Sequence, residues 1–148
     1  MVGWNPAEMA RTRMVKLIKP KKRKSPRQRQ TTKLDKLVGE LIRLKHKHTC
    51  ERCGRGAPRQ LHVHHFHGRR NHSVRWEVNN LFLLCSLCHK LDRNSAHESP
   101  YDFMNWAKSV RGEDWYDQLL VRKNMIVKMD YDFMEYVLKK QINELRDE

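Results

Sequence analysis

Apolar positions between residues 34 and 44 recur at steps of three and four, which is the spacing of one face of an α-helix. These positions are Leu34, Leu37, Val38, Leu41, Ile42 and Leu44. Thr32, followed three residues later by Asp35, is typical of a helix start. We therefore predict an amphipathic helix over residues 32–48, with its apolar stripe in the protein core.

The middle of the chain has short apolar runs in place of a helical stripe. The pattern predicts a strand over residues 61–66 and a second, more buried strand over residues 81–84. The polar stretch 68–73, which contains a glycine, separates them, and a helix is expected from about residue 88. The predicted order is strand, loop, strand, helix, with further helices on either side, and this is an α+β arrangement.

Helical spacing returns in residues 99–148. Ser99 before Pro100 predicts a helix start, Gly112 ends that helix, and Asp130 caps the last helix of the chain. A short helix is expected between them, from about residue 114 to residue 122. The side chains expected to face the core are Phe103, Trp106, Val110, Trp115, Leu119, Met134, Val137, Leu138, Ile142 and Leu145. This helical extension would buttress the central part of the chain or form a homodimer contact.

Positive charge is concentrated at the N-terminal end. The 148-residue chain has a formal net charge of +14, and residues 11–33 hold eleven Lys or Arg and no acid. Self-repulsion, few apolar side chains and two prolines predict a basic arm over residues 1–31 that is disordered or extended. Its expected partner is DNA, because each cation placed on a phosphate releases counterions. The expected contacts, which also resemble part of a nuclear localisation signal, are Lys21, Lys22, Arg23 and Lys24.

The four cysteines form two pairs with C-x2-C spacing, Cys50 with Cys53 and Cys85 with Cys88. Two such turns aim four sulfurs at one point, as a closed, structural Zn²⁺ site requires. Two disulfides are the alternative, and they would need an oxidising compartment. The first residues lack the apolar core of a signal peptide, and no apolar run approaches the roughly 18 residues of a membrane span. We therefore expect structural zinc in an intracellular, cytoplasmic protein, or in a nuclear one if the host is eukaryotic.

The histidine-rich segment between the cysteine pairs carries a motif. Val63-His64-His65-Phe66 is followed by Asn79-Asn80-Leu81, and then by Cys85-x2-Cys88-His89. In this order, the residues resemble the HNH endonuclease family, which has a ββα-metal fold. The resemblance implies a zinc-braced HNH core over residues 49–98, a hairpin and helix that hold one divalent cation, and hydrolysis of DNA phosphodiester bonds.

The resemblance also implies roles for individual residues. His64 and His89 match the ligands of the catalytic cation. His65 matches the general base, and Asn80 matches the asparagine that ties down the loop and orients that base. Asn79 is the alternative to Asn80 if the register slips by one residue. The surplus residues that compete for a role are His62, His67, His72 and His97, together with Asn94 as a substitute for His89.

The chemistry suits these residue types. A neutral imidazole accepts a proton from water near pH 7, and a cation stabilises charge on the leaving oxygen. A site with two imidazoles accepts Mg²⁺ weakly and Mn²⁺, Ni²⁺ or Zn²⁺ more strongly, and we expect Mg²⁺ or Mn²⁺ for turnover. Neighbouring strand residues point to opposite faces, so the strand must end or distort at His64 and His65 for both to serve one site. The flanking phosphates would be held by Arg69, Arg70 and Arg75.

The sequence therefore predicts a metal-dependent endonuclease that acts on duplex or branched DNA. The tract from Arg75 to Asn80, followed by the second cysteine pair, is similar to phage recombination nucleases of the NinG/Rap type, and this similarity implies branched substrates. A phage-encoded or restriction-type nicking enzyme is equally compatible. The alternative is a zinc-containing nucleic-acid-binding protein without catalysis, in which the histidines contact phosphate or bind additional zinc.

Overall fold

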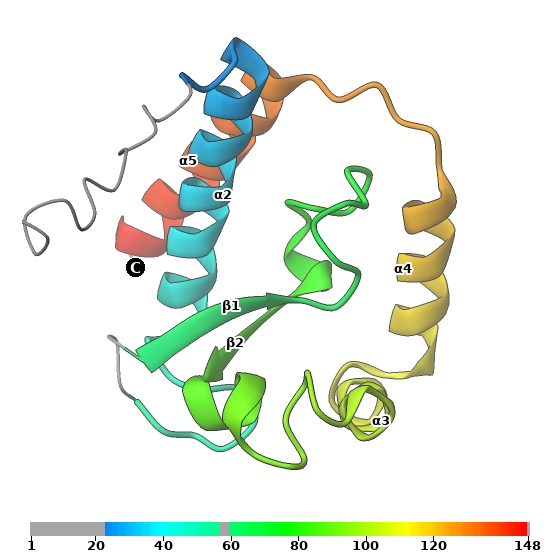
Figure 1. Cartoon of the computed structure of the whole chain (residues 1–148). Coiled ribbons are helices and arrows are strands. Elements are labelled where there is room, and N and C mark those ends of the chain that lie inside the picture. The colour runs from blue at the N-terminus through cyan, green and yellow to red at the C-terminus, as the bar shows by residue number, and fades with distance from the viewer. Residues whose placement is uncertain (1–22, 57–59, 148) are drawn as a thin grey trace, which may run out of the picture.

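The structure is a computed structural model, and it describes residues 23–56 and 60–147. Its elements are α2 (Pro26–Lys45), β1 (Leu61–His65), η2 (Val78–Asn80), β2 (Leu81–Cys85), η3 (Leu87–Leu91), α3 (Pro100–Arg111), α4 (Glu113–Asn124) and α5 (Tyr131–Asp147). In Figure 1, α2 and α5 lie on one side of the small sheet, and α3 and α4 lie on the other. The predicted order of strand, loop, strand and helix is present, with a helix of one short turn, which confirms the α+β class with a ββα core.

The helix α2 begins earlier than the sequence pattern predicted. The Ser25 side chain accepts a hydrogen bond from the main-chain N–H of Gln28, and the Gln28 side chain accepts one from the N–H of Ser25. This reciprocal capping, with Pro26 in the first turn, starts the helix inside the segment expected to be part of the arm. The predicted start at Thr32 is wrong, because its hydroxyl donates to the Gln28 carbonyl within the helix. Residues 1–22 of the expected arm over residues 1–31 lie outside the described residues.

The two strands form an antiparallel hairpin in the centre of the fold. Leu61 pairs with Cys85 at one end, and His65 pairs with Leu81 at the other. Every residue of β2 is buried, because α2 covers one side of the hairpin and α3 and α4 cover the other. The stripe of α2 is buried at Leu34, Val38, Leu41 and Ile42, as predicted. Truncating a leucine in such a core to alanine costs about 2–5 kcal/mol.

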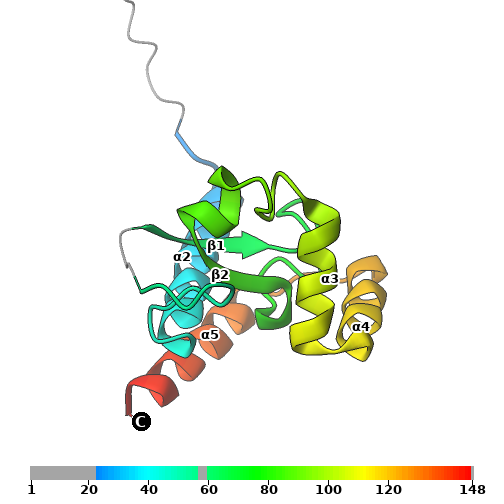
Figure 2. The same ribbon diagram turned by 90° about the horizontal axis from the view of Figure 1, so that it is seen from below.

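The C-terminal helices complete the core. Phe103 and Trp115 are buried against the hairpin, whereas Leu138 and Ile142 of α5 are buried on the other side, where α5 runs along α2. Figure 2 shows the same two pairs of helices from below. The prediction for Val110 is wrong: its side chain is 56% exposed. None of the described helices is both long enough and apolar enough to cross a membrane.

A buried ion pair fastens α3 to the hairpin. The Arg111 guanidinium donates to the Leu81 carbonyl at 2.8 Å and to the Glu51 carboxylate at 3.0 Å, and it stacks over the Phe82 ring at 3.8 Å. The other oxygen of Glu51 accepts from the N–H of Leu83 at 2.7 Å. Because Glu51 follows the first cysteine, this contact joins the first cysteine turn, β2 and the end of α3.

Candidate active site

The four cysteines converge on one point. Cys50 and Cys53 lie in the turn after α2, and Cys85 and Cys88 lie at the junction of β2 and η3. All four sulfurs lie within 4.8 Å of one another, and those of Cys53 and Cys85 are 3.7 Å apart. A tetrahedron with Zn–S bonds of about 2.3 Å has edges of about 3.8 Å, so these sulfurs fit zinc. All four cysteines are free, so the structure contains no disulfide.

The local chain builds each cysteine turn. In the first turn, Gly54 adopts φ of +70° and donates its N–H to the Cys50 carbonyl, while the N–H of Cys50 donates to the Arg55 carbonyl. In the second, burial opposes ionisation of Cys85, but the hydrogen bonds from Cys88 and the other thiols outweigh it and lower the Cys85 pKa to about 7. Burial, with hydrogen bonds from neighbouring thiols, raises the pKa of Cys53 and of Cys88. A divalent cation that stabilises the thiolates therefore suits this group of four sulfurs.

Three imidazoles form a second cluster beside the cysteines. His64 comes from β1, His89 from η3 and His97 from the turn before α3. One ring nitrogen of each lies within 4.8 Å of the others, and the Nε2 atoms of His89 and His97 are 3.2 Å apart. His64 is 9% exposed and meets the Phe103 ring edge to face at 4.9 Å. The predicted pair, His64 and His89, is therefore brought together, with a third histidine beside it.

The third histidine is placed by main-chain contacts with the cysteine turn. The N–H of Ala96 donates to the Cys88 carbonyl at 2.9 Å, and that of His97 donates to the His89 carbonyl at 3.3 Å. These bonds fold the turn back onto η3, so His97 joins His89 instead of replacing it. The main-chain carbonyl of Asn94, the other proposed substitute, accepts a hydrogen bond from the Arg52 side chain. No periodicity in the sequence marks this turn, which is why His97 was only one of several candidates.

Burial keeps the imidazoles of His64 and His89 neutral. It lowers the pKa of His64 to about 3, and the nearby His89 and His97 lower it further. Burial, followed by His97 and His62, lowers the pKa of His89 to about 4. At pH 7 both rings therefore carry lone pairs that a metal cation can accept. His62 is exposed; its ring stacks on His89 at 5.2 Å, and its Nε2 lies 3.2 Å from the Ser86 hydroxyl.

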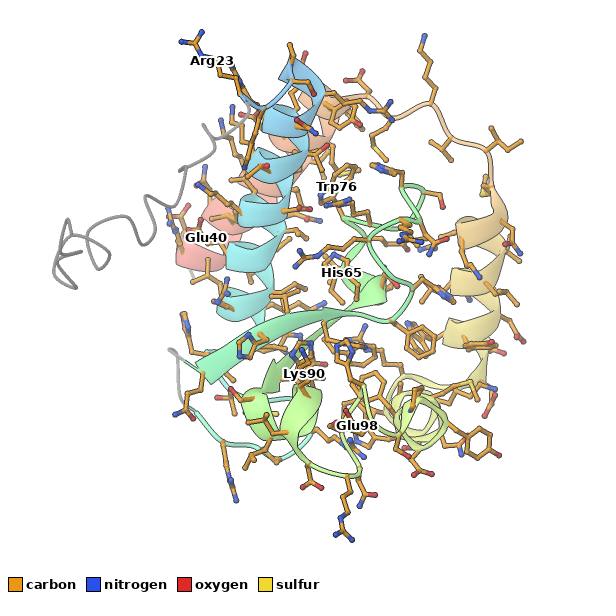
Figure 3. All side chains as sticks on the ribbon, in the orientation of Figure 1. Arg23, Glu40, His65, Trp76, Lys90 and Glu98 are labelled. Carbon is orange, nitrogen blue, oxygen red and sulfur yellow. The ribbon has the colours of Figure 1, made fainter. Side chains whose placement is uncertain are left out.

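His65 faces the opposite side of the hairpin from this cluster. Strand β1 ends at His65, but both histidines keep the regular pairing of the strand, so their side chains lie on opposite sides of it and the distortion expected to bring them to one side is not present. Figure 3 shows His65 on the side of β1 that faces Trp76, away from Lys90 of η3. Burial lowers its pKa to about 4, with a further contribution from Arg69, while a hydrogen bond to the Arg75 main chain raises it. The Nε2 atom of His65 is buried and has no hydrogen-bond partner among the described residues.

Asn80 fixes the loop between the strands. Its side chain is fully buried, accepts from the His67 N–H at 2.7 Å, and donates to the carbonyls of His67 and Val74 at 3.0 Å each. Asn79 is exposed, and its main-chain carbonyl accepts from Arg111 and from Trp115. The loop is thus tied at both ends by Asn80.

The predicted phosphate contacts differ in their surroundings. Arg69 and Arg70 are exposed, as are Arg23 and Lys24 before α2. The guanidinium of Arg75, in contrast, is committed to Asp35 and to the Arg69 carbonyl. Lys21 and Lys22 lie outside the described residues.

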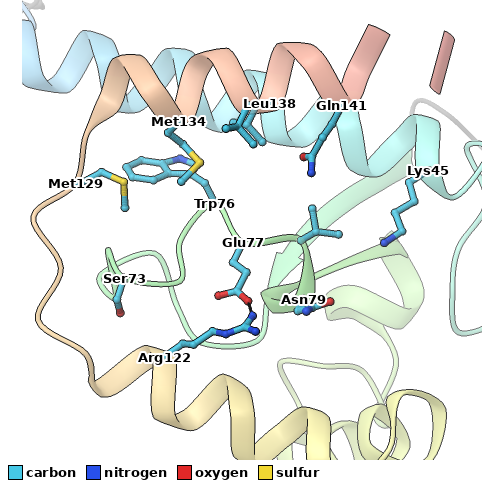
Figure 4. A pocket seen from close by; sticks show the side chains of 12 residues that line it. Lys45, Ser73, Trp76, Glu77, Asn79, Arg122, Met129, Met134, Leu138 and Gln141 are labelled. Atoms are coloured by element: carbon cyan, nitrogen blue, oxygen red, sulfur yellow. Dashed lines mark hydrogen bonds and ion pairs between the residues drawn. The ribbon is translucent and has the colours of Figure 1, made fainter. Parts of the chain in front are cut away.

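A pocket between α5, α4 and the start of η2 is separate from the histidines. Figure 4 shows Trp76, Met134 and Leu138 along one wall, with an ion pair between Glu77 and Arg122 on the other. None of the clustered histidines lines this pocket, and neither does His65.

Comparison with protein families gives one match. Residues 50–95 match the model of the HNH endonuclease family. Comparisons with curated proteins and with solved structures found no match. The matched segment begins at the first cysteine, contains His64, His65, Asn80 and His89, and stops two residues before His97. With the four-cysteine cluster and the ββα arrangement, this match places residues 50–95 in the HNH endonuclease family.

Proposed function

We propose that the protein is a metal-dependent endonuclease that hydrolyses DNA phosphodiester bonds. Membership of the HNH family supports nucleic-acid cleavage in general. The observation that carries the specific proposal is the cluster of three imidazoles, His64, His89 and His97. His65, whose Nε2 has no hydrogen-bond partner among the described residues, is next to His64 in the sequence. The cysteine cluster would hold structural zinc and take no part in the chemistry.

The ligands of the catalytic cation would be His64, His89 and His97. When bound there, a divalent cation supplies Lewis-acid stabilisation of the charge that develops on the phosphate and the leaving oxygen. In the described part of the chain no carboxylate joins this group. Imidazole suits transition metals better than Mg²⁺, so we expect Mn²⁺ to support turnover at lower concentration than Mg²⁺, and Ni²⁺ or Zn²⁺ to bind more tightly still.

His65 would take the proton from the attacking water. The Nε2 atom of His65 has no hydrogen-bond partner among the described residues. A neutral ring that carries its proton on Nδ1 would therefore keep a free lone pair on Nε2, as a general base needs. With a pKa of about 4, this ring is neutral at pH 7, but it is a weaker base than an exposed imidazole.

DNA is the proposed substrate because exposed cations surround the site. Arg69 and Arg70 follow the strand that ends in His65, and the basic segment at residues 11–33 leads into α2. Such contacts give affinity that depends on salt and not on base sequence. Branched or recombination intermediates are the narrower proposal, and cleavage of linear, nicked, flapped and four-way DNAs of matched sequence tests it.

A plasmid-nicking assay tests the proposed function. The wild-type protein should nick supercoiled DNA with Mn²⁺ or Mg²⁺, and His65→Ala should lose nicking but still bind DNA. His48→Asn is the matched control, because His48 is exposed and its φ of +53° is tolerated by asparagine. Equal cleavage by His65→Ala would contradict its role as the base. DNA binding without cleavage in any of these metals would instead identify a non-catalytic zinc-containing nucleic-acid-binding protein.

A further inference from the structure

The first turns of α2 and the loop before η2 border a groove, which we call the α2 groove. Arg27, Thr31 and Asp35 line it from the helix, and they share one face because they recur at steps of four residues. His72 and Arg75 line it from the loop. Its volume is about 820 Å³, and clefts that hold ligands are usually about 300–1,000 Å³. Neither the clustered histidines nor the cysteines line this groove.

The lining of the α2 groove is strongly basic. Three exposed cations, Arg23, Lys24 and Arg27, lie along it, and Figure 3 shows Arg23 at the start of α2. With Arg75 the lining holds four cations against one acid, Asp35, which is a net charge of +3. Within the described part of the chain, none of the three exposed cations forms an ion pair. Like charges held this close repel one another, so an anion between them would be stabilising.

Two of the exposed cations are held in place by neutral partners. Arg27 donates from Nε to the Tyr131 hydroxyl at 3.2 Å, at the start of α5. Among the described residues, no hydrogen bond involves either Nη atom of Arg27, so both can contact an anion. The ammonium of Lys24 donates to the Thr32 hydroxyl at 3.3 Å, which places this side chain along α2. A guanidinium held in this way offers two parallel N–H groups to the oxygens of a phosphate.

The fourth cation, Arg75, is bound within the protein. Its guanidinium donates to Asp35 at 3.0 and 2.7 Å and to the Arg69 carbonyl at 2.8 Å. The last contact joins the α2 groove to the loop that carries the exposed Arg69 side chain. Asp35 also accepts from the Trp76 indole N–H at 2.8 Å, and Figure 3 shows His65 on the side of β1 that faces Trp76. The groove therefore lies on the same side of the hairpin as the proposed base.

We propose that the α2 groove holds the sugar–phosphate backbone of one DNA strand beside the cleavage site, with Arg23, Lys24 and Arg27 on its phosphates. This inference rests on the proposed function for the choice of DNA as partner. It assigns a DNA contact to Arg27, within the folded helix, and it gives Arg75 the role of supporting the groove. Contacts of this kind position a protein on DNA without reading its base sequence.

The salt dependence of DNA binding tests the proposal. Fluorescence anisotropy of a labelled duplex, with full-length, zinc-loaded protein and no other divalent cation, measures binding without cleavage. The slope of log K against log salt concentration should be about 0.9 shallower in Arg27→Gln and in Lys24→Gln. It should be about 2.7 shallower in the triple variant that adds Arg23→Gln. Lys36→Gln is the matched control, because it removes one charge from an exposed position of α2 outside the groove.

The slope of Lys36→Gln should equal that of the wild type. An unchanged slope in the triple variant overturns the proposal, and so does a shift in Lys36→Gln equal to that in Arg27→Gln. Shallower slopes in a wild-type protein that fails to cleave with Mn²⁺ or Mg²⁺ would support the groove and contradict the nuclease function. Cleavage by the wild type together with an unchanged slope in the triple variant would do the opposite.

NMR locates the contact and identifies the source of the phosphate. Signals of the His72 ring and of the Arg27 Nε–H should shift when the duplex is added, because both groups line the groove. Inorganic phosphate, added at the concentration at which the duplex saturates these shifts, should leave them nearly unchanged. Equal shifts with inorganic phosphate would identify a site for the free ion and overturn the assignment to a DNA strand.

Discussion

The buried side chain of Asn80 should contribute several kcal/mol to the free energy of unfolding. In Asn80→Ala the N–H and the carbonyl of His67 lose their partner, and the Val74 carbonyl keeps only the Glu77 N–H, at 3.2 Å. A lost hydrogen bond that leaves a buried group without a partner costs about 1–3 kcal/mol. Some groups will recover a partner when the loop relaxes, so we expect a loss of about 3–5 kcal/mol in total. That is a large part of the 5–15 kcal/mol typical of a domain.

Urea unfolding of the zinc-loaded protein measures this loss. With a slope of about 2 kcal/mol per molar urea, the midpoint of Asn80→Ala should fall by about 1.5–2.5 M. Asn80→Asp should lie between Ala and wild type, because its oxygen still accepts from the His67 N–H but its charge faces two carbonyls. Hydrogen exchange at the His67 amide should accelerate in both variants.

The neighbouring asparagine supplies the control. Asn79 is exposed and uses only its main-chain carbonyl in the contacts with Arg111 and Trp115. Asn79→Ala should therefore change stability by less than about 0.5 kcal/mol. If Asn80→Ala and Asn79→Ala unfold at the same urea concentration, the loop is not held in the way described above.

Three further predictions concern the rest of the fold. Cys53→Ser should reduce the bound zinc, measured by elemental analysis, and lower the melting temperature, because three sulfurs no longer close the site; full zinc content would contradict a four-sulfur site. Arg111→Met removes the Glu51 carboxylate's arginine partner and leaves it only the Leu83 N–H and the His46 ring, so it should cost about 3 kcal/mol, whereas adding Glu51→Gln should recover part of that loss in a double-mutant cycle; additive losses would show that the pair does not interact. Because burial lowers the pKa of His64 to about 3 from 6.5, the unfolded chain binds the proton more readily, so without added Mn²⁺ stability should be full above pH 6.5 and decline as the pH falls toward 3. His64→Gln should flatten that decline in urea unfolding followed against pH, and an equal slope in both proteins would place the titration elsewhere.

Local sequence signals predicted most of the architecture. The stripe of α2 and the unbroken apolar run of β2 report on burial directly, because each pattern is a property of a single element. The convergence of the four cysteines was predicted from the sequence, because C-x2-C spacing already places the two sulfurs of each pair side by side. The start of α2 was missed because the basic composition around Ser25 concealed the capping pair with Gln28.

The parts that sequence did not reveal depend on contacts between distant segments. His97 reaches the cluster only because the turn before α3 bonds back onto the main chain of η3. Asp35 reads as a residue of the first helical turn in the sequence, whereas in the fold it contacts Arg75, forty residues away. Arg75 was predicted to contact phosphate for the same reason. The sequence does not reveal that its guanidinium has a partner elsewhere in the protein, Asp35.

The most direct test of the account is to measure Mn²⁺ binding and DNA cleavage on the same preparations of three proteins. Electron paramagnetic resonance gives the affinity for Mn²⁺, and a single-turnover assay gives the cleavage rate. His89→Ala should weaken Mn²⁺ binding by more than about tenfold and lose cleavage, because it removes one of three ligands. His65→Ala should bind Mn²⁺ as tightly as the wild type and still fail to cleave. Loss of Mn²⁺ binding in His65→Ala, or wild-type cleavage by His89→Ala, would contradict the division of roles between the cation-binding histidines and the base.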